Sequence, residues 1–267
     1  MNVILSDGEF QQFRGMIRDV AGISMSDAKK QLVSGRLAKR LAFFKLSSYG
    51  GYYRLLMKDK AELQVAVDLL TTNETYFFRE PKHFDFLQHE VLPELRGNGP
   101  VRIWSGACST GEEPYTLAMI LGSSLGARPW EILASDISSR VLDKARAGRY
   151  PLDAIKGIPP ALLNRFCLKG VGSNHGVFII EPTLASRISF MPINLNNPLP
   201  AVGQFDVIFL RNVMIYFDNQ TKTQVVQRLL GHLRPGGYFV ISHSESLNGI
   251  TDELQLVRPS IYRKPGA

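Results

Sequence analysis

The chain of 267 residues contains only two cysteines, Cys108 and Cys167, and five histidines. Because the cysteines form neither a Cys-x-x-Cys pair nor a zinc-type cluster with the histidines, we expect no disulfide framework and no metal site. An uninterrupted apolar run of membrane-spanning length is also missing. The N-terminus, MNVILSDGEF, lacks the basic and apolar regions of a signal peptide. These absences favour a cytoplasmic protein without membrane insertion.

Acidic residues are fewer than basic ones, 24 against 31, which gives a formal net charge of +7. This excess indicates an acidic partner, which at this stage is a nucleic acid, an anionic membrane surface or an acidic protein. A hydrophobic content of 45% is ordinary for a globular protein. The length suits one large domain or two modest ones with a sizeable core.

The first 70 residues contain no convincing strand. The stretch SDGEFQQFRGMIRDVAG opens on a Ser6/Glu9 capping box and ends at Gly22, which are signals for the start and the end of a helix. A second stretch, SDAKKQLVSGRLAKRLAFF, repeats the apolar spacing of a helix face. We expect helices within residues 6–22, 26–44, 48–57 and 60–70.

From residue 100 onward, strand patterns alternate with helix patterns. Strands are predicted for the apolar runs VRIWS, EILASD, RISFMPINL, FDVIFLRN and GGYFVIS, and a closing hairpin for LQLVRPSIYRKP. This alternation predicts the α/β class, with a mostly parallel sheet that helices cover on both faces. Ligands of such sheets lie beyond the carboxyl ends of the strands, so the loops that follow the strands are the candidate site.

The loop GACSTG after the first of these strands differs from the dinucleotide fingerprint GxGxxG. Gly106 and Gly111 match its outer glycines, but Cys108 replaces the middle glycine that lets the backbone approach a pyrophosphate. Glu112 and Glu113 follow at the start of the next helix, where they disfavour a dianionic ligand. A cationic ligand without phosphate fits better. S-adenosylmethionine, with a sulfonium, an ammonium, a ribose and an adenine, has these properties.

Asp136 ends the next strand in ILASD, where a carboxylate can accept both ribose hydroxyl protons. Taken singly, Glu112 and Glu113 could be favourable first-turn charges and Asp136 a helix N-cap. Their coincidence at two adjacent strand ends favours a nucleoside site.

Two more stretches carry polar residues that could reach the same edge. In TTNETYFFREP, Arg79 adjoins an aromatic cluster, which fits either a capped helix entry or bidentate binding of a carboxylate. In FDVIFLRNVMIYF, Arg211 and Asn212 follow a buried strand, either as caps or as ligand contacts. HSES could line this edge too, but nothing in the sequence pairs His243 with a nucleophile.

These stretches together resemble the chemotaxis receptor methyltransferases, the CheR family. The matching pieces are NETYFFRE, WSGACSTGEEPY, ASDIS, INL, RNVMIYF and HSES, in the order and spacing of the family, and the resemblance covers nearly the whole chain. It implies an all-helical N-terminal receptor-docking domain over 1–72. It also implies a Rossmann-like class I S-adenosylmethionine methyltransferase domain over 73–267. Relatives often have alanine or serine at Cys108, so the position keeps a small side chain.

The resemblance further implies an activity and the residues that perform it. The enzyme would be a protein-glutamate O-methyltransferase that uses S-adenosylmethionine to esterify glutamate side chains on the cytoplasmic helical bundle of chemoreceptors, for chemotactic adaptation. Arg79 and Tyr216 would lie nearest the transferred methyl group as the catalytic pair. The implied cofactor contacts are Asn73, Thr75, Arg79, Glu113, Asp136, Asn194, Leu195, Arg211 and Asn212.

Residues 26–45 are a candidate surface for receptor docking. They carry six basic residues against one acid, and Lys29, Arg36 and Arg40 fall on one side of the expected helix. A solvated face is the commoner explanation for such a run. Because the implied substrate is a glutamate-bearing helix, we favour docking here.

Residues 149–187 make a connection of about forty residues where a short loop would suffice. Within it, RFCLKGVGSNHGVFIIEP predicts two short strands around a glycine-rich turn, and hence a small antiparallel β insert. Such an insert could simply shield the sheet edge. In some relatives of the resembled family it binds a short peptide at the receptor C-terminus by strand addition, and we expect the same here.

Two other functions stay open at this point. A nucleic-acid methyltransferase agrees with the net charge of +7, but base methylation favours a motif such as Asn-Pro-Pro-Tyr after the fourth strand, where this chain has RNVMIY. A non-catalytic nucleotide-sensing module is the other. We expect a monomeric enzyme with no nucleic-acid partner.

Overall fold

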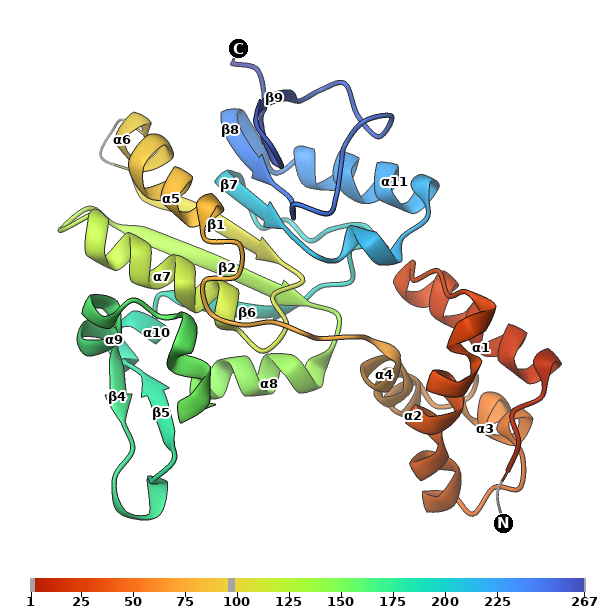
Figure 1. Cartoon of the computed structure of the whole chain (residues 1–267). Coiled ribbons are helices and arrows are strands. Elements are labelled where there is room, and N and C mark those ends of the chain that lie inside the picture. The colour runs from red at the N-terminus through yellow and green to blue at the C-terminus, as the bar shows by residue number, and fades with distance from the viewer. Residues whose placement is uncertain (1–2, 96–98, 267) are drawn as a thin grey trace.

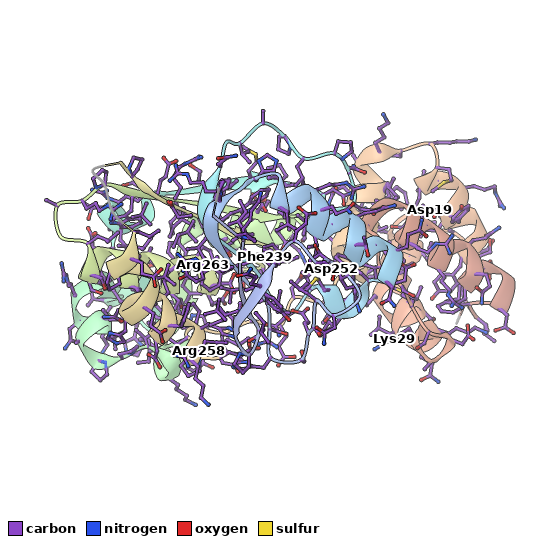
Figure 2. All side chains as sticks on the ribbon, turned by 90° about the horizontal axis from the view of Figure 1, so that it is seen from above. Asp19, Lys29, Phe239, Asp252, Arg258 and Arg263 are labelled. Carbon is purple, nitrogen blue, oxygen red and sulfur yellow. The ribbon has the colours of Figure 1, made fainter. Side chains whose placement is uncertain are left out.

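The computed structural model describes residues 3–95 and 99–266, and it places a helical unit beside an α/β domain (Figure 1). Seen from above, the two parts form an elongated molecule with the helical unit at one end, where Asp19 and Lys29 are labelled (Figure 2). Within the described ranges, none of the helices has both the length and the apolar character needed to cross a membrane.

The helical unit contains α1 to α4, and its boundaries follow the local signals in the sequence. Ser6 and Glu9 form the capping box of α1, which ends at Gly22 with a left-handed φ of 72°. The apolar faces pack into a core of their own around residues such as Phe13 and Leu37. The bounds are α1 Asp7–Ala21, a 3₁₀ turn Asp27–Lys29, α2 Lys30–Phe43, α3 Tyr49–Leu56 and α4 Lys60–Leu70.

Seven strands of the described residues form one mixed sheet in the order β6-β2-β1-β7-β8-β10-β9. The first five in this order run parallel, and the β9–β10 hairpin closes one edge antiparallel. The predicted Rossmann-like class and the closing hairpin are thus confirmed. The strand bounds are β1 Val101–Gly106, β2 Trp130–Asp136, β6 Ile188–Pro192, β7 Phe205–Leu210, β8 Leu233–Val240, β9 Gln255–Arg258 and β10 Ile261–Arg263.

Helices cover both faces of this sheet. One face packs against α7, α8 and the segment from α5 to α6, through a core that includes Phe84 and Leu117. The other face packs against α11, through Val225 and Leu229. Since the chain returns from β6 to β7 on the other side of β1, the strand order reverses between β1 and β7, where such folds bind ligands. The bounds are α5 Lys82–Phe86, a π-helical turn Leu87–Val91, α6 Leu92–Glu94, α7 Glu112–Ser124, α8 Ser139–Ala147, a 3₁₀ turn Met214–Tyr216 and α11 Asn219–Leu230.

A second, antiparallel sheet in the order β3-β5-β4 forms the predicted insert. β4 and β5 flank the glycine-rich turn as expected, and their hairpin projects from the body of the domain (Figure 1). β3 is a further strand that the sequence pattern did not indicate, because it is only three residues long and ends in a proline. The bounds are β3 Arg149–Pro151, α9 Pro160–Phe166, β4 Cys167–Lys169, β5 Val177–Ile180 and α10 Pro182–Ala185.

The helical unit is held against the carboxyl ends of the parallel strands. Nδ2 of Asn194, which follows β6, donates to the carbonyl of Val20 at 2.6 Å. The N–H of Ser24 donates to the carbonyl of Tyr216, which follows β7, at 2.7 Å. These bonds place the end of α1 over the loops in which the sequence predicts a ligand.

Candidate functional site

A pocket lies between the helical unit and the carboxyl ends of β1, β2 and β7. The helical unit contributes an apolar part of its lining, including Ile23, Met25 and Leu32. All nine predicted cofactor contacts line the same pocket, together with Tyr216 and Lys29. Loops far apart in the sequence therefore converge at the point where the strand order reverses.

The loop after β1 turns sharply on residues with left-handed backbone. The φ angles are 59° at Ala107, 51° at Ser109 and 98° at Gly111. A Cβ at Gly111 would lie 2.8 Å from the hydroxyl oxygen of Tyr150 and 2.9 Å from Cβ of Ala145, so no larger residue fits without a shift. The outer glycine of GACSTG serves this close approach, which brings α7 up to the pocket.

The two glutamates that follow this loop point in different directions. Glu113 lines the pocket, and its carboxylate accepts the Ser105 hydroxyl at 2.7 Å. Glu112 is 8% exposed and accepts the Thr110 hydroxyl at 2.7 Å, and burial raises its pKa. The expected collar of two carboxylates is therefore wrong for Glu112, since of this pair only Glu113 lines the pocket.

Asp136 forms the pocket wall at the end of β2. Its Oδ2 accepts the N–H of Ser109 and its Oδ1 accepts the N–H of Ser138, both at 2.9 Å. Burial raises the pKa of Asp136, and these hydrogen bonds oppose that rise. The N-cap of α8 is Ser138, so the alternative in which Asp136 caps this helix is wrong. Two acceptor oxygens can still serve ribose hydroxyls, because each carboxylate oxygen has a second lone pair.

Arg211, just after β7, is buried among acids. Its side chain is 1% exposed, and its Nη1 donates to Glu113 at 2.8 Å. Its Nη2 donates to the carbonyl of Arg79 at 2.5 Å and lies 3.3 Å from Oε2 of Glu80. Its Nε has no hydrogen-bond partner among residues 3–95 and 99–266. The next residue, Asn212, has a φ of 59°, which turns the chain sharply at the pocket.

The predicted catalytic pair, Arg79 and Tyr216, reaches the pocket from two separate segments. Nη1 of Arg79 donates to the carbonyl of Glu74 at 2.8 Å, and the guanidinium carbon lies 5.6 Å from the centre of the Tyr76 ring. Tyr216 ends the 3₁₀ turn after β7. Both side chains are half-buried, so a bound molecule can contact them.

Other predicted contacts are held by hydrogen bonds to neighbouring side chains and backbone. The carbonyl of Asn73 accepts the Ser109 hydroxyl at 3.0 Å. Oδ1 of Asn194 accepts the N–H of Asn196 at 2.9 Å. The carbonyl of Leu195 accepts Nη1 of Arg228 at 3.1 Å. These bonds tie Asn73, Asn194 and Leu195 in the pocket wall to their neighbours.

The three predicted docking residues occupy different environments. Lys29 is exposed and lines the pocket. Nη1 of Arg36 donates to the carbonyls of Leu70 and Thr71 at 2.9 and 3.0 Å, which fixes the end of α4. Arg40 forms an ion pair with Glu62 on α4. Two of the three therefore hold the helical unit together, and their docking role stays a prediction.

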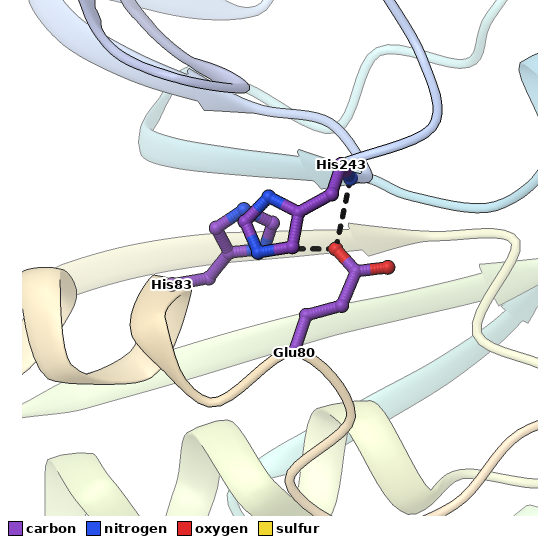
Figure 3. A group of neighbouring side chains, drawn as sticks. All are labelled: Glu80, His83 and His243. Carbon is purple, nitrogen blue, oxygen red and sulfur yellow. Dashed lines mark hydrogen bonds and ion pairs between the residues drawn. The ribbon is translucent and has the colours of Figure 1, made fainter.

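Glu80, His83 and His243 lie together behind Arg211, with potential metal-ligand atoms within 4.8 Å of one another (Figure 3). The two imidazole rings are 4.4 Å apart, and both bond to the Ser260 hydroxyl, at 2.6 and 3.0 Å. Oε2 of Glu80 already accepts the N–H of His243 at 3.0 Å and faces Arg211. Nδ1 of His83 lies 3.5 Å from Oε2 of Glu80 and has no hydrogen-bond partner among the described residues. Because Oε2 of Glu80 already contacts Arg211 and the N–H of His243, we describe the cluster as a support for Arg211.

Glu245 is a residue that sequence reasoning missed. Its Oε2 accepts the N–H groups of Ser242 and Asn212 at 2.9 and 3.2 Å, and its Oε1 accepts the N–H of Ile215 at 3.3 Å. The side chain therefore shapes the loop that carries Asn212 into the pocket. The HSES motif marks the position of Glu245, but nothing in that motif indicates its bonds to the loop after β7.

Two family models match adjoining parts of the chain. The all-alpha domain of the CheR methyltransferases matches residues 8–71, and the SAM binding domain of the CheR methyltransferases matches residues 73–262. The chain belongs to the CheR methyltransferase family. It is therefore an S-adenosylmethionine-dependent methyltransferase, and the family, the enzyme class and the cofactor predicted from the sequence are confirmed.

Curated relatives resemble this CheR-family chain over almost its whole length. Chemotaxis protein methyltransferase 2 of Pseudomonas aeruginosa is 41% identical over 257 residues, which cover 95% of this chain and 92% of the relative. The chemotaxis protein methyltransferase of Escherichia coli is 39% identical over 263 residues, which cover 97% and 91%. That of Borreliella burgdorferi is 35% identical over 277 residues, which cover 99% and 96%. The likeness extends over the helical unit as well as the sheet.

Proposed function

We propose that this enzyme transfers the methyl group of S-adenosylmethionine to glutamate carboxylates on the cytoplasmic helical bundle of chemoreceptors, in the cytoplasm and as a monomer. In this proposal, residues 1–72 dock the receptor and residues 73–267 carry out the transfer. The observation that carries it is the convergence in one pocket of Arg79 and Tyr216 with Glu113 and Asp136. This arrangement offers acidic groups to a cationic nucleoside and an arginine to an incoming carboxylate.

Each pocket residue has a role that follows from its chemistry. Asp136 accepts the ribose hydroxyls, and Glu113 faces the ammonium or sulfonium of the cofactor. Asn73, Thr75, Asn194, Leu195, Arg211 and Asn212 complete the binding surface. Arg79 orients the substrate carboxylate near the methyl group, because a guanidinium matches the two oxygens of a carboxylate. Tyr216 lies beside it as the second group near the transferred methyl.

The transfer itself needs positioning rather than acid–base chemistry. A glutamate side chain is ionised at pH 7, so its oxygen can attack without a base. A lone pair on that oxygen forms the bond to the methyl carbon while the carbon–sulfur bond breaks, and its electron pair returns to sulfur. The products are a methyl ester and a neutral thioether in S-adenosylhomocysteine. Alignment of the two reacting atoms at roughly 3–3.5 Å contributes about 7–11 kcal/mol.

Replacing Asp136 by alanine tests the cofactor site. Loss of a charge-assisted bond to the ribose, worth about 1.5–3 kcal/mol, should weaken S-adenosylhomocysteine binding by at least about tenfold in titration calorimetry. Asp136→Asn keeps one acceptor for the backbone and should lose less affinity than Asp136→Ala. Unchanged affinity in a folded Asp136→Ala protein would remove this residue from the site.

Reversing the charge of Lys29 tests receptor docking without breaking the contacts of Arg36 and Arg40. Lys29→Glu should slow receptor methylation several-fold at low salt, with a smaller effect at high salt, because exposed charges are screened. Lys58→Glu is the matched control, since it makes the same charge change at an exposed residue of the helical unit outside 26–45. Equal receptor methylation rates for both variants at low salt would mean that the basic face of residues 26–45 is exposed to solvent and does not dock the receptor.

The β insert is proposed to bind a peptide at the receptor C-terminus by adding a strand. Leu168 on β4 and Val171 beyond it are 49% and 78% exposed, and β4 pairs with β5 on one side in the order β3-β5-β4. A receptor tail peptide should bind the intact enzyme and lose affinity when residues 170–176 are removed. Failure of every cognate tail peptide to bind would leave the helical unit as the docking surface.

A further inference from the structure

Glu80 stands at a strained turn beside the pocket but does not line it. Its φ is 59° and that of Phe78 is 56°. This is a left-handed backbone conformation that residues other than glycine rarely adopt. Such strain persists only where surrounding contacts enforce it, and it gathers at functional sites. The contacts of the Glu80 carboxylate therefore need an explanation.

That carboxylate joins three segments of the chain. Oε1 accepts Nδ2 of Asn212 at 3.3 Å, and Oε2 accepts the N–H of His243 at 3.0 Å (Figure 3). Oε2 also lies 3.3 Å from Nη2 of Arg211. Glu80 thus ties the segment before α5 to the loops that follow β7 and β8.

Glu80 and Glu113 bind opposite ends of one guanidinium. Arg211 gives Nη1 to Glu113 at 2.8 Å and turns Nη2 toward Glu80. Burial would raise the pKa of Glu80, but the charge of Arg211 and the hydrogen bonds hold it below its ordinary value, so the group is ionised. Two carboxylates therefore share one buried cation, and neither is fully neutralised by it.

The neighbouring histidine adds no positive charge to this pair. His83 is 1% exposed. Burial, with the charge of Arg211 next in weight and then His243, lowers the pKa of His83 to about 3. The ring is therefore neutral at pH 7, so the negative charge of Glu80 faces the positive charge of Arg211 and not that of a histidine.

We propose that Glu80 is a positioning residue that shares the positive charge of Arg211 with Glu113 and so leaves negative charge on Glu113 for the cationic part of the cofactor. This inference rests on the proposed contact between Glu113 and the cofactor. Without the Glu80 charge, Arg211 pairs with Glu113 alone, and the attraction of the pocket for an ammonium or sulfonium falls. Because Glu80 acts through its charge, its effect on affinity should depend on the charge of the ligand.

Glu80→Gln removes the charge and keeps the size of the side chain and one acceptor oxygen. Titration calorimetry should give about tenfold weaker binding of S-adenosylhomocysteine, comparable to the loss of one charge-assisted hydrogen bond. Binding of adenosine, which lacks the ammonium, should be unchanged. In an Arg211→Met background, Glu80→Gln should have no further effect on S-adenosylhomocysteine affinity, because the residue through which it acts is gone. Glu90→Gln is the matched control and should bind both ligands as the unmodified enzyme does, since Glu90 is exposed.

Any of three results would overturn this role. One is unchanged affinity of Glu80→Gln for S-adenosylhomocysteine. Another is that Glu80→Gln weakens adenosine binding as much as S-adenosylhomocysteine binding. The third is that Glu80→Gln weakens S-adenosylhomocysteine binding equally in the Arg211→Met background. Either of these would make Glu80 only a support for the fold. Glu113→Gln separates this inference from the proposed site. If Glu113→Gln also leaves S-adenosylhomocysteine affinity unchanged, the proposed cofactor contact fails first.

Discussion

Replacing Arg79 by alanine should lower the rate of methyl transfer to a receptor about 10²- to 10³-fold, with little change in the free energy of unfolding. The size follows from the loss of one preorganised donor at the reacting group. Among the residues that the structure describes, the guanidinium interacts with the Glu74 carbonyl and with the ring of Tyr76, which is 55% exposed. Single-turnover methylation and thermal unfolding measure the two quantities separately.

The conservative variant Arg79→Lys is the informative companion. Lysine keeps the charge but not the two-pronged geometry that matches a carboxylate, so it should recover only part of the lost rate. A loss of rate that tracks a loss of stability across the two variants would support the simpler interpretation of this segment as a helix entry.

Replacing Arg40 by alanine should destabilise the helical unit by about 3–5 kcal/mol, because it leaves a buried carboxylate without its cation. The Glu62 side chain is 5% exposed, and it takes two hydrogen bonds from Arg40 and one from the Tyr52 hydroxyl. Denaturant unfolding of the variant measures the change. Lys39→Ala, a neighbouring exposed position on the same helix, should change the stability by less than about 0.5 kcal/mol.

The double variant Arg40→Met with Glu62→Gln is expected to regain much of the stability, since neither buried charge is then left alone. A stability of Arg40→Ala close to that of the unmodified protein would mean that Arg40 is free to serve receptor docking alone. This test matters because a charge reversal at Arg40 would otherwise confuse unfolding with loss of docking.

The parts of the fold that sequence reasoning predicted are those with local causes. The Ser6 cap and Gly22 set the ends of α1, and the apolar runs set the strands, since caps and periodicity depend on neighbouring residues alone. β3 was not predicted, because its three residues, Arg149–Pro151, become a strand only through pairing with β5. The π-helical turn at Leu87–Val91 likewise carries no pattern that separates it from an ordinary helix.

In the pocket too, residues with local sequence signals could be predicted and residues that depend on long-range contacts could not. Asp136 could be found because it ends β2, and Glu113 because it starts the helix after the β1 loop, and this class of sheet binds ligands at such positions. Glu80 and Glu245 could not, because their roles depend on a left-handed turn and on the convergence of loops after different strands. The docking role predicted for Arg36 and Arg40 rests on the charge pattern of residues 26–45 and on a glutamate-bearing substrate, and nothing in that pattern indicates their bonds to α4. Long-range pairing of this kind becomes visible only in three dimensions.

The fate of a labelled methyl group tests the account most directly. The enzyme is incubated with methyl-labelled S-adenosylmethionine and the cytoplasmic fragment of a chemoreceptor from the same organism, and the receptor is then treated with mild alkali. We expect label to enter the receptor on glutamate side chains and to leave as methanol in alkali, as an ester must. Absence of transfer to any cognate receptor, or label that resists alkali, would contradict it.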